Sequence, residues 1–218
     1  MNKNSPQNDL SAVPKAVVSR MSLYLRELQH LIRDEKKTIS SRKLGRLLGL
    51  TDAQVRKDLA YFGQFGYPGI GYRCEELVEE IRRILGTDRI WPAAMIGVGN
   101  LGQALLGYRG FQSQGFEVLA AFDTDQKIVG TVICGLKVHH LKDLKKIVGE
   151  KAIQLAILAV PAEAATSVVE AIVDSGIHGV LNFAPVTLNL PKSVSVVGVD
   201  LAMELEQLAF AVVSKTEK

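Results

Sequence analysis

A short run of glycines is the stretch of this sequence whose residue types and spacing point most directly to chemistry. Residues 95–102 read MIGVGNLG, a G-x-G-x-x-G pattern that follows an apolar segment and opens a helix-like run. In such a pattern the first glycine allows a tight turn, the second lets backbone approach a pyrophosphate, and the third lets the helix pack on the strand. Backbone N–H groups at the helix start favour phosphates. The pattern predicts dinucleotide binding, over the alternative of a plain tight turn, through Gly97, Val98, Gly99, Asn100, Leu101 and Gly102.

An acidic residue ends the next apolar segment, where the ribose of a bound nucleotide would lie. Asp123 follows residues 117–122 and stands 21 residues after Gly102. A carboxylate there accepts hydrogen bonds from ribose hydroxyls, and it would repel a 2′-phosphate. The expected cofactors are therefore NADH and NAD+ rather than their phosphorylated forms.

Two further strand ends are candidates for the nicotinamide side of this site. Ligands of an open parallel sheet bind at the carboxyl ends of its strands, and residues 155–160 and 179–183 are both strand-like. At the second of these ends, an ordinary strand-to-loop turn is the alternative. The candidate residues are Val160, Pro161, Asn182, Phe183 and Ala184.

Charge is distributed unevenly along the chain, although the formal net charge is only +3. Residues 15–73 carry 12 Lys or Arg against 5 Asp or Glu, a balance of +7. Residues 91–218 carry 10 against 12, a balance of −2. A basic N-terminal third on a nearly neutral remainder indicates a polyanionic partner for that third alone.

The basic third has the pattern of a helix-turn-helix. A long helix from Pro14 is predicted by apolar residues at three- and four-residue steps, and a second helix starting at Ser40-Ser41 should bury Leu44, Leu47 and Leu48. A third helix, residues 53–62 capped by Thr51 or Asp52, should bury Val55, Leu59 and Phe62 and read the major groove. The expected DNA contacts are Ser40, Ser41, Arg42, Lys43, Arg46, Gln54, Arg56, Lys57 and Tyr61.

A glycine-spaced segment, residues 63–72, follows the third helix and is predicted to form a small β-hairpin, the wing of a winged helix. A connecting helix over residues 75–85 should complete this part of the chain. The alternative is a three-helix packing domain whose basic face is merely solvated.

From residue 92 onward, apolar strand-like segments alternate with helix-like ones. Strands as apolar as residues 155–160 imply burial on both faces, as in a doubly wound parallel sheet. The expected fold is α/β: a winged helix-turn-helix domain, a Rossmann-type sheet and a C-terminal helix. The expected bounds are a mobile arm over residues 1–14, the DNA-binding domain over 15–86, the nucleotide-binding domain over 87–200 and the C-terminal dimerisation helix over 201–218.

Several function classes are disfavoured by what the sequence lacks. No apolar run approaches the 18 to 20 residues, roughly, of a membrane span, and residues 1–14 do not have the pattern of a secretory signal, so we expect a cytoplasmic protein. Cys74 and Cys134 have no metal-ligand spacing. No histidine has an evident base-and-orienter arrangement and no substrate domain remains, so we expect no catalysis. The alternatives are an NAD-dependent oxidoreductase with a helical interaction domain and a structural dinucleotide-binding subunit.

Taken together, these motifs resemble the Rex family of redox-sensing transcriptional repressors over nearly the whole chain after Val13. The resemblance implies a homodimer whose winged helices bind palindromic operator DNA and whose second domains sense the NADH/NAD+ ratio, with NADH causing release from DNA. It rests on Ser40-Ser41, residues 54–59, 61–63 and 69–72, and on residues 96–105, 122–123, 160–162, 176–177, 181–186 and 199–201.

The resemblance also implies three switch residues and an exchanged helix. Arg20, Tyr108 and Asp200 match the family's polar switch positions, and an Arg–Asp pair formed in one cofactor state would supply the differential contact a switch requires. The last helix is expected to be domain-swapped onto the partner, although its apolar stripe, Leu201, Leu205, Leu208, Ala209 and Val212, would also suit a cover within one chain. One departure concerns the wing, which has Tyr67-Pro68 where the family often has a basic residue.

Overall fold

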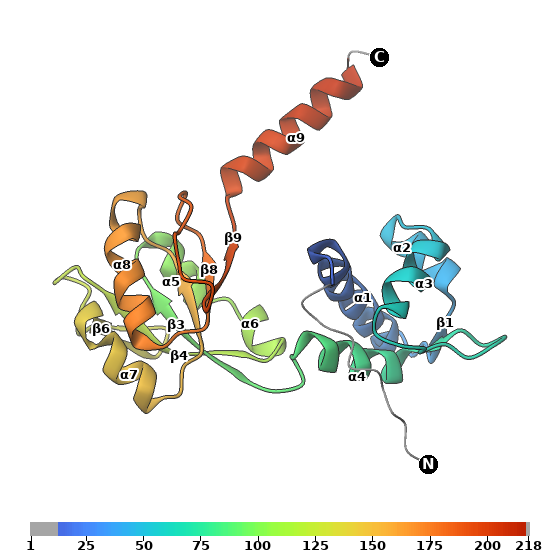
Figure 1. Cartoon of the computed structure of the whole chain (residues 1–218), viewed down its shortest axis with the longest axis horizontal. Coiled ribbons are helices and arrows are strands. Elements are labelled where there is room, and N and C mark those ends of the chain that lie inside the picture. The colour runs from blue at the N-terminus through green and yellow to red at the C-terminus, as the bar shows by residue number, and fades with distance from the viewer. Residues whose placement is uncertain (1–12, 217–218) are drawn as a thin grey trace. The chain divides into compact units, whose positions relative to one another are not determined.

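The chain divides into two compact units between Arg89 and Ile90. The computed structural model describes residues 13–216, and Figure 1 draws their helices and strands. The expected N-terminal arm lies outside the described residues except for Val13 and Pro14.

The N-terminal unit is built on a long amphipathic helix. All six apolar residues that the periodicity places on one face of α1 are buried: Val17, Met21, Tyr24, Leu25, Leu28 and Leu31. They form one core with apolar residues of the other helices. The elements are α1 (Lys15–Arg33), β1 (Thr38–Ile39), α2 (Ser41–Leu48), α3 (Asp52–Ala60), β2 (Tyr72–Arg73) and α4 (Cys74–Leu85).

Helices α2 and α3 form the expected helix-turn-helix, with each start set by a side-chain cap. The Ser40 hydroxyl accepts from the Lys43 N–H at 3.2 Å, and the Thr51 hydroxyl accepts from the Gln54 N–H at 3.1 Å. Such caps satisfy N–H groups that have no partner within the helix. The expected burial of Leu47 is wrong, because the inner face of α2 is centred on Leu44 and leaves Leu47 48% exposed.

The wing differs from the predicted hairpin. Its tip is closed by a single antiparallel bridge between Tyr67 and Gly71. Within the described residues this bridge does not extend into a ladder of paired residues. The strand pairing lies instead at its base, where β2 runs antiparallel to β1. Sequence alone did not indicate β1, because a two-residue strand has no periodicity to detect.

The C-terminal unit contains a seven-stranded sheet in the order β5-β6-β4-β3-β7-β8-β9. All neighbours are parallel except β5 and β6, which form an antiparallel hairpin. Without β5, the chain order of the strands across the sheet is 3-2-1-4-5-6, the arrangement of dinucleotide-binding folds. The strands are β3 (Trp91–Ile96), β4 (Phe116–Asp123), β5 (Val132–Ile133), β6 (Leu136–His140), β7 (Leu155–Leu158), β8 (Gly179–Asn182) and β9 (Ser195–Gly198).

Helices cover the two faces of this sheet unequally. Figure 1 shows α7 and α8 together, and their apolar residues pack against one face. Leu105 and Leu106 of α5 and Phe111 of α6 pack on the other face, near β3 and β4. The short helix α6 was not expected. The helices are α5 (Asn100–Leu106), α6 (Gly110–Ser113), the 3-10 turn η2 (Leu141–Asp143), α7 (Leu144–Glu150), α8 (Ala162–Ser175) and α9 (Leu201–Thr216).

Two apolar surfaces of the C-terminal unit are left uncovered by the described residues. A groove of about 390 Å³ crosses β7, β8 and β9 on the face opposite α8, and Ile157, Leu181 and Val197 line it. In addition, every side chain of α9 is exposed, including Leu205 and Leu208 of the apolar stripe. The chain therefore supplies no intramolecular cover for this helix among residues 13–216.

Candidate functional site

The glycine-rich loop joins β3 to α5 at the point where the strand order reverses. Gly97 has a φ of +88°, and a Cβ there would stand 2.5 Å from the Ala159 carbonyl oxygen. A Cβ on Gly102 would collide with the carbonyl oxygen of Gly97. A larger residue at Gly97 would therefore press on the segment after β7, and one at Gly102 would force α5 from the loop, which accounts for glycine at both positions.

The second glycine of the motif faces open space. No atom lies within 4 Å of a Cβ built on Gly99, so its backbone is accessible to a ligand. A cavity of about 250 Å³ adjoins it at the carboxyl ends of β3, β4 and β7. It brings together five of the predicted cofactor residues, Gly97, Gly99, Asp123, Val160 and Pro161.

The Asp123 carboxylate is tied to this loop. Its Oδ2 accepts from the Val98 N–H at 2.7 Å, while Oδ1 accepts from the N–H groups of Thr124 and Asp125 at 2.7 and 2.9 Å. A carboxylate offers about four acceptor sites, and three are used here, so about one remains for a ribose hydroxyl. Asp125, Thr124 and Ser167 also line the cavity and were not predicted; the second acid of the Asp-x-Asp sequence was the available signal.

The side chain of Asn182, at the end of β8, binds the loop that follows this strand. Its side chain is buried, and its amide nitrogen donates to the carbonyl oxygens of Ala184 and Val186 at 3.2 and 2.9 Å. Its Oδ1 accepts from the Ala184 N–H at 3.0 Å. The amide therefore shapes the loop after β8. A nicotinamide contact by Asn182, Phe183 or Ala184 stays a prediction, and none of the three lines the cavity beside Gly99.

The helix-turn-helix presents a set of exposed cations. Arg42, Lys43, Arg46 and Lys57 are exposed, and none of their side chains forms an ion pair with another residue between 13 and 216. Arg56 is also exposed, but it donates to Asp52 at 2.8 Å and to the Ser41 hydroxyl at 3.1 Å. It therefore braces α3 against the start of α2. Tyr61 is half-buried beside the core and caps the end of α3.

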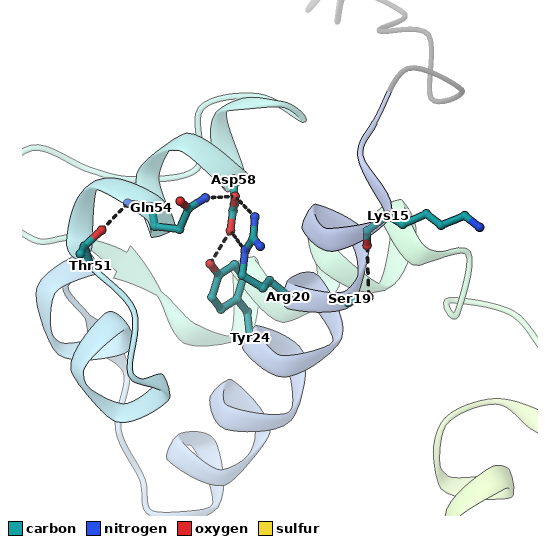
Figure 2. Close-up of polar contacts among 7 residues, drawn as sticks. All are labelled: Lys15, Ser19, Arg20, Tyr24, Thr51, Gln54 and Asp58. Atoms are coloured by element: carbon teal, nitrogen blue, oxygen red, sulfur yellow. Dashed lines mark hydrogen bonds and ion pairs between the residues drawn. The ribbon is translucent and has the colours of Figure 1, made fainter. Parts of the chain in front are cut away.

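A buried carboxylate on α3, which sequence reasoning did not single out as a site residue, anchors this helix to α1. Figure 2 shows the Asp58 side chain surrounded by Arg20, Tyr24 and Gln54. Arg20 donates to both carboxylate oxygens at 2.5 and 2.7 Å, the Tyr24 hydroxyl donates at 2.7 Å, and the Gln54 amide donates at 2.6 Å. Gln54 therefore turns toward the protein. Asp58 follows Val55 by three residues on the buried face, which was the available signal.

The electrostatics of this cluster favour the ionised carboxylate. Burial by itself would raise the pKa of Asp58, but the hydrogen bonds from Arg20, Tyr24 and Gln54 hold that pKa below its ordinary value. The pKa of the Arg20 guanidinium is raised, chiefly by its hydrogen bond to Asp58. The cluster is thus a fully paired charge network between α1 and α3.

The three expected switch residues occupy different elements. Arg20 pairs with Asp58 within the N-terminal unit. Tyr108, after α5, is exposed, and its ring meets that of Phe111 edge-on at 5.1 Å. Asp200 caps α9 by accepting from the N–H groups of Ala202 and Met203 at 2.9 and 3.2 Å. A pairing among Arg20, Tyr108 and Asp200 stays a prediction.

Other kinds of site are not found in the described part of the chain. Among residues 13–216 no group of three or more His, Cys, Asp or Glu side chains could hold a metal ion. In the same range, no helix combines the length and the apolar character that crossing a membrane requires.

The fold and these sites define a two-domain protein in which a winged helix-turn-helix precedes a Rossmann-type nucleotide-binding domain. A family model described as a putative DNA-binding protein N-terminus matches residues 12–60, and one described as a CoA binding domain matches residues 88–186. The redox-sensing transcriptional repressor Rex of Syntrophobacter fumaroxidans is 43% identical over 199 residues, which cover 91% of this chain and 95% of that protein. The chain therefore belongs to the Rex family of redox-sensing transcriptional repressors.

Solved structures agree with this assignment. The structure of RSP in complex with beta-NAD+ and operator DNA has a TM-score of 0.89 and 33% identity, covering 94% of each chain. RSP in complex with beta-NADH has a TM-score of 0.85 and 31% identity, covering 94% of this chain and 96% of that one.

Proposed function

We propose that this protein represses transcription by binding palindromic operator DNA as a homodimer, and that NADH releases it from that DNA. One observation carries the proposal: a single chain joins an accessible cavity at the glycine-rich loop to a helix-turn-helix whose exposed cations Arg42, Lys43, Arg46 and Lys57 form no ion pair within residues 13–216. Its relatives support the same function, because one is a redox-sensing transcriptional repressor and RSP forms complexes with beta-NAD+ and operator DNA and with beta-NADH.

The nucleotide cavity is suited to NAD(H). The open backbone at Gly99 would receive the pyrophosphate, and Asp123 would accept from a ribose hydroxyl while disfavouring a 2′-phosphate. The bound cofactor would supply only a difference in ring charge and shape between its oxidised and reduced forms. The protein would bind and orient it beside Val160 and Pro161 without moving a proton, so the function needs no catalysis.

The DNA-binding surface would combine phosphate neutralisation with groove reading. Arg42, Lys43 and Arg46 are exposed on α2, where they would contact phosphates, and Lys57 is exposed on α3, from which it would reach the major groove. Ser40 and Ser41 would add contacts at the start of α2.

A homodimer would explain the two uncovered apolar surfaces. Helix α9 and the groove over β7, β8 and β9 both expose apolar side chains that a second copy could bury. Exchange of α9 between subunits, as in the expected domain swap, would use the first of these surfaces.

The proposed switch would act through the partners of Arg20. In this chain Arg20 holds Asp58 on the recognition helix. If Arg20 pairs with Asp200 in one cofactor state, with Tyr108 in the same cluster, the orientation of α3 becomes coupled to the nucleotide-binding domain. Such an exchange would change the spacing of the two recognition helices and so their fit to successive half-sites.

Fluorescence anisotropy of a labelled palindromic promoter fragment tests this function. The protein would be titrated at fixed salt with NADH, NAD+, NADPH and coenzyme A in separate series. We expect release by NADH alone, with no consumption of NADH in the mixture. If no nucleotide changes operator binding, the two domains are not functionally coupled. Steady turnover of NADH would favour an oxidoreductase.

A further inference from the structure

The wing of this protein carries no charge along its length. Residues 62–72 contain no Lys, Arg, Asp or Glu, although the surrounding N-terminal third is strongly basic. An uncharged wing has no cation with which to neutralise phosphates, so any contribution it makes to DNA binding must come from neutral hydrogen bonds, shape and apolar contact.

The wing tip is a tight, internally bonded turn. The Ile70 N–H donates to the Tyr67 carbonyl at 3.1 Å, and Tyr67 and Gly71 exchange two backbone hydrogen bonds at 2.7 and 2.9 Å. Pro68 and Gly69, the latter with a φ of +77°, occupy the two central positions. Proline followed by a glycine of positive φ is the signature of a type II turn, in which proline also limits the unfolded alternatives.

Three side chains then fasten this turn to the body of the domain. The Tyr67 hydroxyl donates to Glu76 Oε2 at 3.0 Å, and Arg73 donates to Glu76 Oε1 at 2.8 Å. The Arg73 guanidinium also lies over the Tyr67 ring, 4.7 Å from its centre. Because Tyr67 belongs to the turn, Arg73 to β2 and Glu76 to α4, the cluster joins three elements.

The same contacts engage the positive charge of Arg73, the residue that follows the wing. Arg73 forms an ion pair with Glu76, whose pKa is lowered chiefly by that hydrogen bond. The pKa of Tyr67 is raised by its hydrogen bond to Glu76, so the phenol stays a neutral donor. At the tip of the wing the large exposed side chains are apolar or aromatic: Ile70 is 52% exposed and Tyr67 42% exposed.

We propose that Tyr67, Arg73 and Glu76 are positioning residues that hold the wing tip in a preset shape, so that Ile70 and Pro68 make an apolar contact with the groove of the operator. This inference rests on the proposed DNA-binding function and names how one part of that surface acts. Apolar side chains that wedge against base steps and sugars are an established means of reading DNA shape. Arg73 on this view is a brace and not a phosphate ligand.

A charge-neutral double variant, Arg73→Gln with Glu76→Gln, tests the brace. We expect operator affinity to fall about fivefold, which is the effect of losing hydrogen bonds that preset the turn. The slope of log affinity against log salt should stay unchanged, because no phosphate contact is lost. Ile70→Ser should weaken binding in the same way, and Tyr67→Phe, which removes one hydrogen bond, should have a smaller effect in the same direction.

A matched control lies on the same helix. Glu80→Gln with Arg83→Gln removes an exposed pair of the same spacing, 2.9 Å apart, that makes no hydrogen bond to the wing turn. We expect this variant to bind operator like the wild type.

Two results would overturn the inference. If the Arg73/Glu76 double variant lowers the salt slope by about 0.9, Arg73 is a phosphate ligand. If that variant, Tyr67→Phe and Ile70→Ser all bind like the wild type, the wing tip does not touch DNA. Failure of the wild-type protein to bind the operator would instead refute the proposed function, so the two failures are distinguishable.

Discussion

Asp123 illustrates how one carboxylate can order a binding loop and also select a ligand. Its contact with the Val98 N–H links the end of β4 to the glycine-rich turn before any ligand enters. The residue therefore positions the loop in addition to offering an acceptor to a ribose.

Asp123→Ala should weaken NADH binding about tenfold or more, because hydrogen bonds to a charged acceptor are lost. Operator binding should persist, since the N-terminal unit is untouched. Anisotropy with an NADH titration measures both effects, with the exposed acid substitution Asp143→Ala as control. Full NADH sensitivity of Asp123→Ala would refute the ribose assignment.

Substitution of Asp58 is expected to have a large effect on the stability of the N-terminal unit. Asp58→Asn should destabilise the N-terminal unit by about 3 kcal/mol at neutral pH, because it leaves Arg20 without its buried partner. Thermal unfolding followed by circular dichroism would measure the change. Asp52→Asn, which breaks the exposed pair on the same helix, should have a smaller effect.

The pH dependence of this difference follows from the lowered pKa of Asp58. A carboxylate whose pKa is lower in the folded state adds stability above its unfolded pKa of about 3.9, and that stability is lost as pH falls through the folded value. The wild type and Asp58→Asn should therefore converge in melting temperature as pH is lowered below about 4. A constant difference down to pH 2, roughly, would show that Asp58 does not titrate as proposed.

At the scale of elements, α3 is the part of the fold that most directly reads sequence in the proposed function. Its two outward cations are not equivalent, because Arg56 is engaged with Asp52 and Ser41 while Lys57 has no ion pair among the described residues. Arg56 would have to leave Asp52 to reach a base edge.

We expect Lys57→Ala to weaken operator binding by roughly 1–3 kcal/mol. Arg56→Ala should cost less, because the wild-type side chain first gives up its contacts within the protein. Lys145→Ala, in the C-terminal unit, is the control. Unchanged operator affinity in both α3 variants would contradict its assignment as the recognition helix.

At the scale of the whole molecule, the exposed apolar helix α9 indicates that one chain is not the complete functional particle. Its stripe of leucines has no cover among residues 13–216. Exposure of such an apolar surface to water is unfavourable in free energy, and association with a second chain would bury it.

The double variant Leu205→Asp with Leu208→Asp should therefore shift the protein from dimer to monomer, because it would bury two charges at the interface. Sedimentation velocity measures the change. Glu206→Gln, on the same helix but outside the stripe, should leave the wild-type association intact. A dimer that survives the double variant would place the interface elsewhere.

Much of this fold follows from local rules that the sequence displays. The glycine pattern predicts the nucleotide loop because glycine is required at two of its positions. Gly97 has a positive φ, and Gly102 lies too close to the Gly97 carbonyl for a side chain. The apolar periodicity of α1 and the capping residues Ser40 and Thr51 likewise predict helices, since both act within a few residues. Fold class and candidate cofactor loop were therefore determined by sequence alone.

Tertiary structure decided the partners of the polar side chains. Asp58 meets Arg20 across 38 positions of sequence, Asp123 meets Val98 across 25, and Asn182 turns inward to bind its own loop. The same holds for Arg73, which becomes a brace only because β2 and α4 bring it between Tyr67 and Glu76. Such pairings depend on how separate elements pack, and no local pattern specifies which of several polar residues will face one another.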